Sequence, residues 1–273
     1  MDILEKIIVA KKKEVEELKS LSNVKRFEEE GFFWNTKSRS LKETLLKEGS
    51  SGIIAEFKRK SPSKGWFKNK ELQVENVVRY YDNYGAAGIS ILTDKEFFGG
   101  DLDDLVKARN ITKAPLLRKD FIIDSWQIAE AKAFGADAIL LIAACLSRQQ
   151  VKDFAGYAKE INLEVLLELH NENELGHICD ETELVGINNR NLKTFEVDIE
   201  RSLKMAENIP VDKIKIAESG IDSVENILLF KENSFKGFLI GELFMKQADP
   251  GKAFAEFISE ITLLEKRKDH SKK

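Results

Sequence analysis

The sequence contains few cysteines: only Cys145 and Cys179 occur among its 273 residues. This number rules out a disulfide framework, and the spacing of the two residues matches no cysteine-based metal site. Cys145 ends an apolar run, so we interpret it as a small buried side chain. His170 has only His177 nearby and no third ligand, so we interpret it as a loop histidine. We therefore expect a cytoplasmic protein in a reducing environment, and we expect no metal centre.

Long apolar runs are also absent. The longest, residues 138–146, falls well short of the ~20 residues that a transmembrane helix needs. Residues 1–6 lack the charged-then-apolar layout of a secretory signal. The sequence therefore predicts neither a membrane anchor nor a leader peptide.

Basic residues are not in excess. The chain has 43 Lys and Arg residues against 47 Asp and Glu residues, which gives a formal net charge of −4. Proteins that bind nucleic acid usually carry a basic surface, so we expect no nucleic-acid partner. Hydrophobic residues make up 42% of the chain and charged residues 33%, as is typical of a globular protein rather than a disordered one.

From residue 52 onward, short apolar segments of strand length alternate with amphipathic segments of helical length. The predicted strands are residues 53–57, 88–92, 115–117, 138–142, 165–169, 184–187, 214–217 and 238–240. Eight strands, each followed by a helix, predict the α/β class and a (β/α)8 TIM barrel. The alternative is an open doubly wound sheet, which is disfavoured because no GxGxxG turn follows the first strand.

The residues before the first strand predict helices. Asp2 is a candidate N-cap for a helix that runs to about residue 19. Its apolar stripe consists of Leu4, Ile8, Val15 and Leu18. A shorter helix is predicted at residues 40–47, and the segment as a whole has too few apolar side chains to form a domain alone.

Three parts of the chain follow from this pattern. We interpret residues 1–50 as an N-terminal helical extension that packs on the barrel, near the catalytic rim. Residues 51–262 form the catalytic barrel. Residues 263–273 are rich in charge, and we interpret them as a solvated tail.

Polar residues follow nearly every predicted strand. In barrels of this kind the active site forms at the carboxyl ends of the strands. The residues at these ends include Glu56, Lys58, Lys60, Thr93, Asp94, Lys119, Asp120, Glu168, His170, Asn188, Arg190, Glu218, Ser219, Gly241 and Glu242. Ordering so many polar groups is costly for structure alone, so the pattern predicts an enzyme.

Glycines mark the last two strand ends, at Ser219-Gly220 and Gly241-Glu242. Backbone N–H groups beside a helix start can bind an anion, and barrels frequently bind phosphate after strands seven and eight. Lys60 and Ser61 follow the first strand, which neighbours the eighth when the barrel closes. We therefore expect a phosphate site here, against the alternative that the glycines only serve tight turns.

These segments resemble the indole-3-glycerol phosphate synthase family. The residues that carry the resemblance are 54–65 (IAEFKRKSPSKG), 92–94 (LTD), 97–100 (FFGG), 117–124 (LRKDFIID), 186–191 (GINNRN), 218–221 (ESGI) and 240–242 (IGE). Each motif is weak alone, but the ordered set is specific and spans essentially the whole chain, including the helical extension. One departure is Ser125-Trp126, where the family commonly has Pro-Tyr, and it concerns packing rather than chemistry.

The resemblance implies a cofactor-free reaction in tryptophan biosynthesis. The substrate would be 1-(2-carboxyphenylamino)-1-deoxyribulose 5-phosphate, which closes its pyrrole ring while losing carbon dioxide and water. By resemblance, Lys119 is the general acid of ring closure and Glu168 the base that assists loss of water. Lys58 contacts the substrate carboxylate and acts in dehydration, while Glu56 and Asn188 are polar partners around the substrate hydroxyls.

The remaining expected contacts bind the substrate. They are Arg190, Lys60, Ser61, Glu218, Ser219, Gly220, Gly241 and Glu242, with Phe97, Phe121 and Leu141 as an apolar wall for the aromatic ring. The expected partner is this small phosphorylated molecule. Association with other enzymes of tryptophan biosynthesis stays open.

Lys119 and Arg118 are neighbours on the third predicted strand, so only one of them faces the barrel interior. The resemblance selects Lys119, which shares the facing of Leu117. Burial among cations would lower the pKa of Lys119, whereas Glu56 and Glu168 would raise it, and the sequence leaves the balance open.

Two other functions compete with this one. A sugar-phosphate isomerase similar to phosphoribosylanthranilate isomerase would share the phosphate site, but it typically uses a Cys/Asp pair. In this chain Glu56 and Lys58 stand at the first strand, where such a cysteine would lie. A non-catalytic phosphate-binding barrel is the second alternative, and the dense ionisable rim argues against it.

Overall fold

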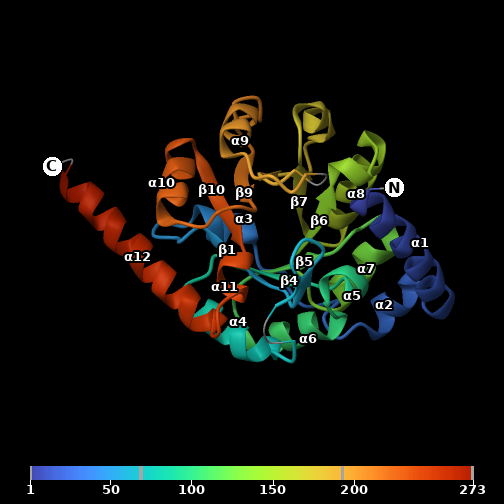
Figure 1. The fold of residues 1–273 in the computed structure, drawn as a ribbon. Helices are drawn as coiled ribbons and strands as arrows, with labels where there is room; N and C mark the ends of the chain where they lie inside the picture. The colour runs from blue at the N-terminus through green and yellow to red at the C-terminus, as the bar shows by residue number, and fades with distance from the viewer. Residues whose placement is uncertain (1, 68–69, 192–193, 272–273) are drawn as a thin grey trace.

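The computed structural model describes residues 2–67, 70–191 and 194–271. Eight parallel strands close into a barrel, surrounded by helices (Figure 1). The strands are β1 (Ile53–Phe57), β4 (Gly88–Leu92), β5 (Leu116–Lys119), β6 (Ala138–Ile142), β7 (Glu164–Leu169), β8 (Leu184–Asn188), β9 (Ile214–Glu218) and β10 (Phe235–Ile240). Each strand pairs with the next, and β10 pairs with β1 to close the ring. The predicted barrel is confirmed, and the open sheet is wrong.

Helices on the outside of the barrel connect successive strands. They are α4 (Val74–Asn83), α6 (Leu102–Ile111), α7 (Ser125–Ala133), α8 (Arg148–Glu160), α9 (Ile199–Ala206) and α10 (Val224–Glu232). A further helix, α12 (Pro250–Ser271), follows the last strand. Shorter elements near the strand ends are α5 (Lys95–Phe98), η1 (Ala143–Cys145), η2 (Glu172–His177) and α11 (Glu242–Met245). A small hairpin that the sequence analysis did not predict, β2 (Lys60–Ser61) and β3 (Gly65–Trp66), follows β1.

The last described residues of the chain are helical. α12 runs through residue 262 without a break, so no element boundary separates the barrel from residues 263–271. In Figure 1 this helix leads away from the barrel toward the C-terminus. Residues 272–273 of the expected tail lie outside the described residues.

The extension contributes α1 (Ile3–Leu21), α2 (Val24–Glu30) and α3 (Leu41–Leu46). Asp2 caps α1 as predicted, accepting a hydrogen bond from the backbone N–H of Glu5 at 2.9 Å. The buried face of α1 differs from the predicted stripe. Its buried residues are Ile7, Lys11 and Val15, whereas Leu18 is exposed. A buried lysine on this face was not anticipated.

Two hydrophobic layers hold the barrel together. Because side chains alternate along each strand, one set fills the interior and the other packs against the helices. The interior set includes Ile54, Leu117, Leu140, Leu166, Ile216 and Leu239, together with Leu41 and Leu45 of α3. Gly88 opens β4, and a Cβ there would lie 2.4 Å from Leu41 Cδ1, so α3 plugs the amino end of the barrel. Within the described ranges, no helix combines the length and apolar character that a membrane span needs.

Trp126 fastens the extension to the barrel. This residue stands at the departure from the family pattern, near the start of α7. Its ring lies 5.2 Å from that of Phe27 on α2, and its indole N–H donates to the carbonyl of Ser22 at 3.0 Å. Trp126 therefore buries apolar area and also satisfies a backbone carbonyl in the link between α1 and α2.

We expect Trp126→Ala to lower the free energy of unfolding by about 3–5 kcal/mol, because it empties a packed aromatic site. Phe32→Ala is the control, since Phe32 also belongs to the extension but is 94% exposed. That control should stay within about 0.5 kcal/mol of the parent. Urea denaturation measures both, and equal losses in the two variants would contradict the anchoring role of Trp126.

Candidate active site

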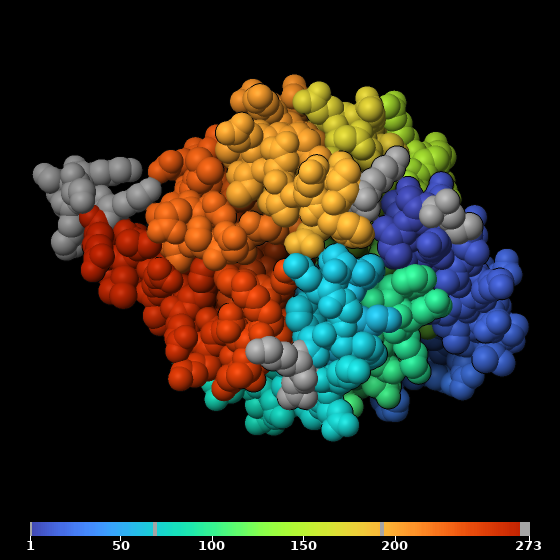
Figure 2. All heavy atoms as spheres, viewed as in Figure 1, coloured from blue at the N-terminus to red at the C-terminus, as the bar shows by residue number. Residues whose placement is uncertain are grey.

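A cavity opens at the carboxyl ends of the barrel strands. Its polar lining includes Glu56, Lys58, Ser61, Lys119, Glu168, Asn188, Arg190, Ser219, Gly220, Gly241 and Glu242. Three residues of α1, Ile3, Leu4 and Ile7, line the same cavity. The extension therefore lies at the catalytic rim, as expected, and forms part of the cavity wall. Figure 2 shows the N-terminal segment (blue), the segment after β1 (cyan) and the segment after β8 (orange-yellow) meeting on one face.

Lys119 lies at the centre of this site. Its ammonium Nζ is 2.5 Å from Glu218 Oε2 and 3.4 Å from Glu168 Oε2. The three residues come from β5, β9 and β7, so the lysine bridges strands on different sides of the ring. It shares the inward facing of Leu117, whereas Arg118 points outward into a separate ionic network.

The carboxylates decide the charge state of Lys119. Burial disfavours the ammonium, but Glu218, Glu168 and Glu56 together outweigh this cost and raise the pKa of Lys119 above its ordinary value. Burial also raises the pKa of Glu218, and nearby Glu168 adds to the increase while Lys119 opposes it. Lys119 is therefore a cation in the resting site, which settles the balance that the sequence left open.

Glu168 is held by three neighbours. Asn188 Nδ2 donates to Glu168 Oε1 at 2.9 Å, and His170 Nε2 lies 2.9 Å from the same oxygen. Burial opposes the charged carboxylate, yet Lys119, His170 and Asn188 lower the pKa of Glu168 below its ordinary value. Burial likewise opposes the imidazolium, but Glu168 and Glu174 raise the pKa of His170 to about 9. His170 is thus part of the charged centre, and not the simple loop histidine that the sequence suggested.

Two further ion pairs define the rim. Lys58 Nζ lies 2.6 Å from Glu56 Oε1, and both residues line the cavity. Arg190 Nη2 contacts Glu242 Oε2 at 3.0 Å and so links the loop after β8 to α11. A Cβ on Gly241 would lie 2.5 Å from Glu56 Oε1, which explains the glycine at this position.

Four expected site residues do not line the cavity. Glu218 lies behind Lys119 and is 1% exposed. Lys60 points away, since its Nζ donates to the carbonyl of Glu96 at 2.7 Å. Phe97 lines a separate groove between α1 and α5, and Leu141 packs against the surrounding helices. The structure therefore does not place these four side chains in the lining of the cavity.

Phe97 and Leu141 each stand one position away from a residue of the apolar wall. Phe98, Phe121, Leu140 and Ile142 form the apolar wall of the cavity. On strand β6 neighbouring residues face opposite sides, so Leu141 points outward between Leu140 and Ile142. Phe97 and Phe98 lie instead on the short helix α5, where successive side chains point about 100° apart. The pairing of the strands shows which residues of β6 face inward. Ile142 of β6 pairs with Glu168 of β7, so the two side chains face the same way, into the barrel.

Several further residues line the cavity that the sequence did not indicate. These include Ile3, Ile7, Pro62, Ser63, Phe195 and Ile221, together with Phe98, Leu140 and Ile142 of the apolar wall. Most come from loops or from the extension, where no strand periodicity indicates facing. Within the ranges that the structure describes, no group of three or more His, Cys, Asp or Glu side chains is arranged to hold a metal ion.

Comparisons with known proteins agree with this geometry. The family model for indole-3-glycerol phosphate synthase matches residues 4–257. An indole-3-glycerol phosphate synthase of Bacteroides thetaiotaomicron is 46% identical over 260 residues, covering 95% of this chain and 99% of the relative. One of Polynucleobacter asymbioticus is 41% identical over 267 residues, covering 94% and 99%.

A solved structure adds evidence on the fold alone. A mutant tryptophan synthase α-subunit from Pyrococcus furiosus superposes with a TM-score of 0.59 at 15% identity. The match covers 78% of this chain and 98% of that chain.

Replacing His170 tests the charged centre. The pKa of His170 is about 9 in the folded chain against the ordinary 6.5, so the imidazolium stabilises the fold below pH 6.5 and this contribution is lost as the pH rises through 9. We expect His170→Gln to lower the free energy of unfolding by on the order of 3 kcal/mol or less near pH 6, with a deficit that shrinks toward pH 9.5. Urea denaturation across this pH range measures the deficit. A stability deficit that does not change with pH would contradict the raised pKa of His170. Glu168→Gln, which removes one of the charges that raise this pKa, should weaken the pH dependence of the deficit.

Proposed function

The chain belongs to the indole-3-glycerol phosphate synthase family, a family of carboxy-lyases in tryptophan biosynthesis, and we propose how its cavity performs that reaction. The substrate is 1-(2-carboxyphenylamino)-1-deoxyribulose 5-phosphate. The observation that carries the assignment of roles is the ammonium of Lys119, held between Glu168 and Glu218 at the boundary between an apolar and a polar wall.

The two walls divide the substrate between them. Phe98, Phe121, Leu140 and Ile142 follow or belong to β4, β5 and β6, and they receive the aromatic ring. Ser61, Ser219-Gly220 and Gly241-Glu242 lie across the ring of strands, after β1, β9 and β10, and they receive the phosphate. The first backbone N–H groups of a helix lack intrahelical partners, which favours an anion at the start of α11.

Ring closure joins an aromatic carbon to the carbonyl carbon of the sugar chain. As this bond forms, the carbonyl oxygen gains negative charge, and Lys119 stabilises it and transfers a proton to it. The bond to the carboxylate then breaks, carbon dioxide leaves, and its electron pair returns to the ring. Because its pKa is raised, Lys119 acts first as a fixed cation beside the developing oxyanion.

Dehydration completes the aromatic pyrrole ring. The new hydroxyl leaves as water after it receives a second proton, and Glu168 accepts the proton that the substrate loses. Lys58 supplies the proton to the departing hydroxyl. Its Nζ lies at the same rim, 2.6 Å from Glu56 Oε1. Asn188 orients Glu168 through their hydrogen bond, and Arg190 contacts the substrate beside Glu242. The roles require neither a metal nor an organic cofactor.

The isomerase alternative finds no support at the rim. Cys145 does not line the cavity, and burial, with a contribution from Glu168, raises the pKa of its thiol to about 12. Such a thiol is a poor acid–base group at neutral pH. A non-catalytic barrel is disfavoured because a half-buried lysine between two buried carboxylates is costly without a task. The two free cysteines support placement in the cytoplasm.

Lys119→Met should lower kcat by at least ~10²-fold, the lower end of general acid–base contributions. The substrate KM should change far less, because the phosphate site lies across the ring and methionine keeps most of the side-chain volume. Product formation by purified protein in the presence of EDTA measures both constants. If Lys119→Met turned over normally and Lys58→Met were inactive, Lys58, which follows β1, would be the general acid of ring closure. Normal turnover in both variants would overturn the proposed roles.

Gly220→Ala tests the phosphate site. Gly220 has φ +66°, and a Cβ there would lie 2.2 Å from Val197 Cγ1, so alanine forces the backbone to move. We expect inhibition by inorganic phosphate to weaken about tenfold, a loss of ~1.4 kcal/mol. Gly85→Ala is the control, because Gly85 has φ +82° with open space around it, at the opposite end of the barrel. Equal inhibition of the two variants would place the phosphate elsewhere.

A further inference from the structure

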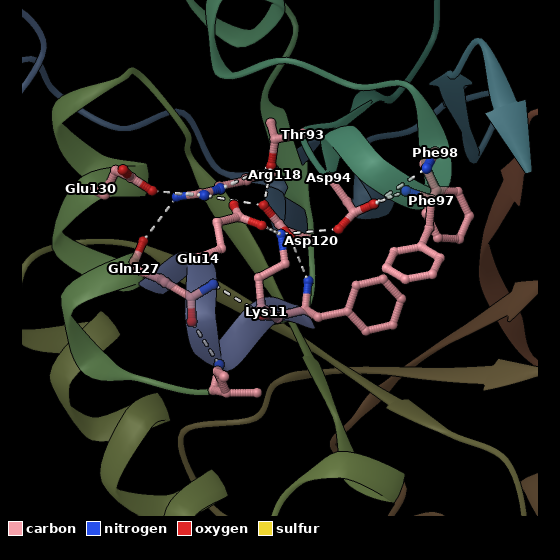
Figure 3. Close-up of polar contacts among 12 residues, drawn as sticks. Lys11, Glu14, Thr93, Asp94, Phe97, Phe98, Arg118, Asp120, Gln127 and Glu130 are labelled. Carbon is pink, nitrogen blue, oxygen red and sulfur yellow. Dashed lines mark hydrogen bonds and ion pairs between the residues drawn. The ribbon is translucent and has the colours of Figure 1, made fainter. Parts of the chain in front are cut away.

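A second ionic cluster lies beside the cavity, between α1 and the ends of β4 and β5 (Figure 3). Its centre is Lys11 of α1, a lysine that is only 1% exposed. The Lys11 ammonium is 2.9 Å from Glu14 Oε2, 3.0 Å from Asp94 Oδ2 and 2.9 Å from Asp120 Oδ1. Lys11 does not line the cavity, and none of the roles assigned above uses it.

The two aspartates that bind Lys11 also hold the aromatic wall. Asp94 Oδ1 accepts hydrogen bonds from the backbone N–H groups of Phe97 and Phe98, at 2.8 and 3.2 Å. Asp120 Oδ1 accepts one from the N–H of Phe121 at 2.8 Å. The rings of Phe98 and Phe121 lie 5.9 Å apart and both line the cavity. Lys11 therefore contacts the carboxylates that fix the backbone of both wall residues.

The same lysine sets the position of α1. Ile7 is one helical turn before Lys11, so the two side chains lie on the same face of the helix. Ile7, together with Ile3 and Leu4, lines the cavity on the side of α1. The ammonium thus joins two parts of one apolar subsite that are distant in sequence.

The rest of the cluster cannot replace this charge. Asp120 Oδ2 accepts from Thr93 at 2.6 Å and lies 3.1 Å from Arg118 Nη2, and Arg118 also pairs with Glu130 at 2.8 Å. Arg118 already serves two carboxylates on the far side of Asp120. Without Lys11, Asp94 and Asp120 would be buried near each other with no cation between them, which is strongly unfavourable.

We propose that Lys11 is a positioning residue for the arylamino part of the substrate. Its ammonium seats α1 against Asp94 and Asp120, so that Ile3, Leu4 and Ile7 close over the wall formed by Phe98 and Phe121. This inference rests on the proposed function, because it deepens the assignment of the apolar wall to the aromatic ring. It predicts selective loss of affinity for the aryl group, with the phosphate site unaffected.

Two ligands separate the effects. 1-(2-Carboxyphenylamino)-1-deoxyribitol 5-phosphate, in which the ketone is reduced, occupies both subsites without reacting, and inorganic phosphate occupies one. We expect Lys11→Met to weaken binding of the aryl ligand at least ~10-fold, which is the lower end of the effect of a missing methylene contact in an apolar pocket. Phosphate binding should change less than about twofold. Isothermal titration calorimetry measures both affinities, and the substrate KM should rise more than kcat falls.

Three further variants control the experiment. Lys11→Arg keeps the charge and should restore most of the affinity for the aryl ligand. Lys19→Met removes another ion pair of α1, that with Asp124 at 2.7 Å, which does not involve the aromatic wall, and it should bind both ligands normally. Asp94→Asn keeps an oxygen for the N–H groups of α5 and should show the same selective loss, so it substitutes for Lys11→Met if that variant fails to fold.

The outcomes distinguish this inference from the proposed function. Normal binding of the aryl ligand by folded Lys11→Met, or equal weakening of both ligands, would overturn the positioning role. Absence of turnover in the parent protein would instead overturn the proposed function, whatever the binding results.

Discussion

A half-buried ammonium group between two buried carboxylates is the interaction on which the centre of this molecule depends. Lys119 of β5 contacts Glu218 of β9 and Glu168 of β7, and each charge would be costly to bury alone. Neighbouring features follow from keeping these charges paired. Gly186 of β8 carries no side chain because a Cβ there would lie 2.1 Å from Glu218 Oε1. His170 and Asn188 hold Glu168 from its other side, which keeps it ionised.

This charged centre separates two chemically different walls. The ends of β4, β5 and β6 present apolar side chains, whereas the ends of β9, β10 and β1 present hydroxyls and backbone groups beside glycine. In the proposed function, the aromatic ring of the substrate binds one wall and its phosphate the other. The proposed pose puts the carbonyl over Lys119, so the binding energy of the two ends would orient the reacting atoms.

The extension packs into the core of the barrel and lines its cavity, so it is not a separate domain. α3 fills the amino end of the barrel with Leu41 and Leu45, while α1 supplies apolar residues to the opposite end. Between them, the pair of Phe27 and Trp126 fixes α2 on α7. The helices of the extension therefore contribute to the core, to the packing on the outer helices and to the active site within a short stretch of chain.

The sequence by itself determined the barrel and most of the inward-facing charges. Strand periodicity gives Glu56, Lys119, Glu168 and Glu218 the same facing as their interior neighbours, because side chains alternate strictly along a strand. The tertiary structure decided what periodicity cannot reach. It turned Lys60 toward Glu96, selected Phe98 over Phe97, and buried Lys11 against two aspartates from other elements. These outcomes depend on loop geometry and on charges that meet only after folding, and the raised pKa of Lys119 likewise results from carboxylates brought to it by distant strands.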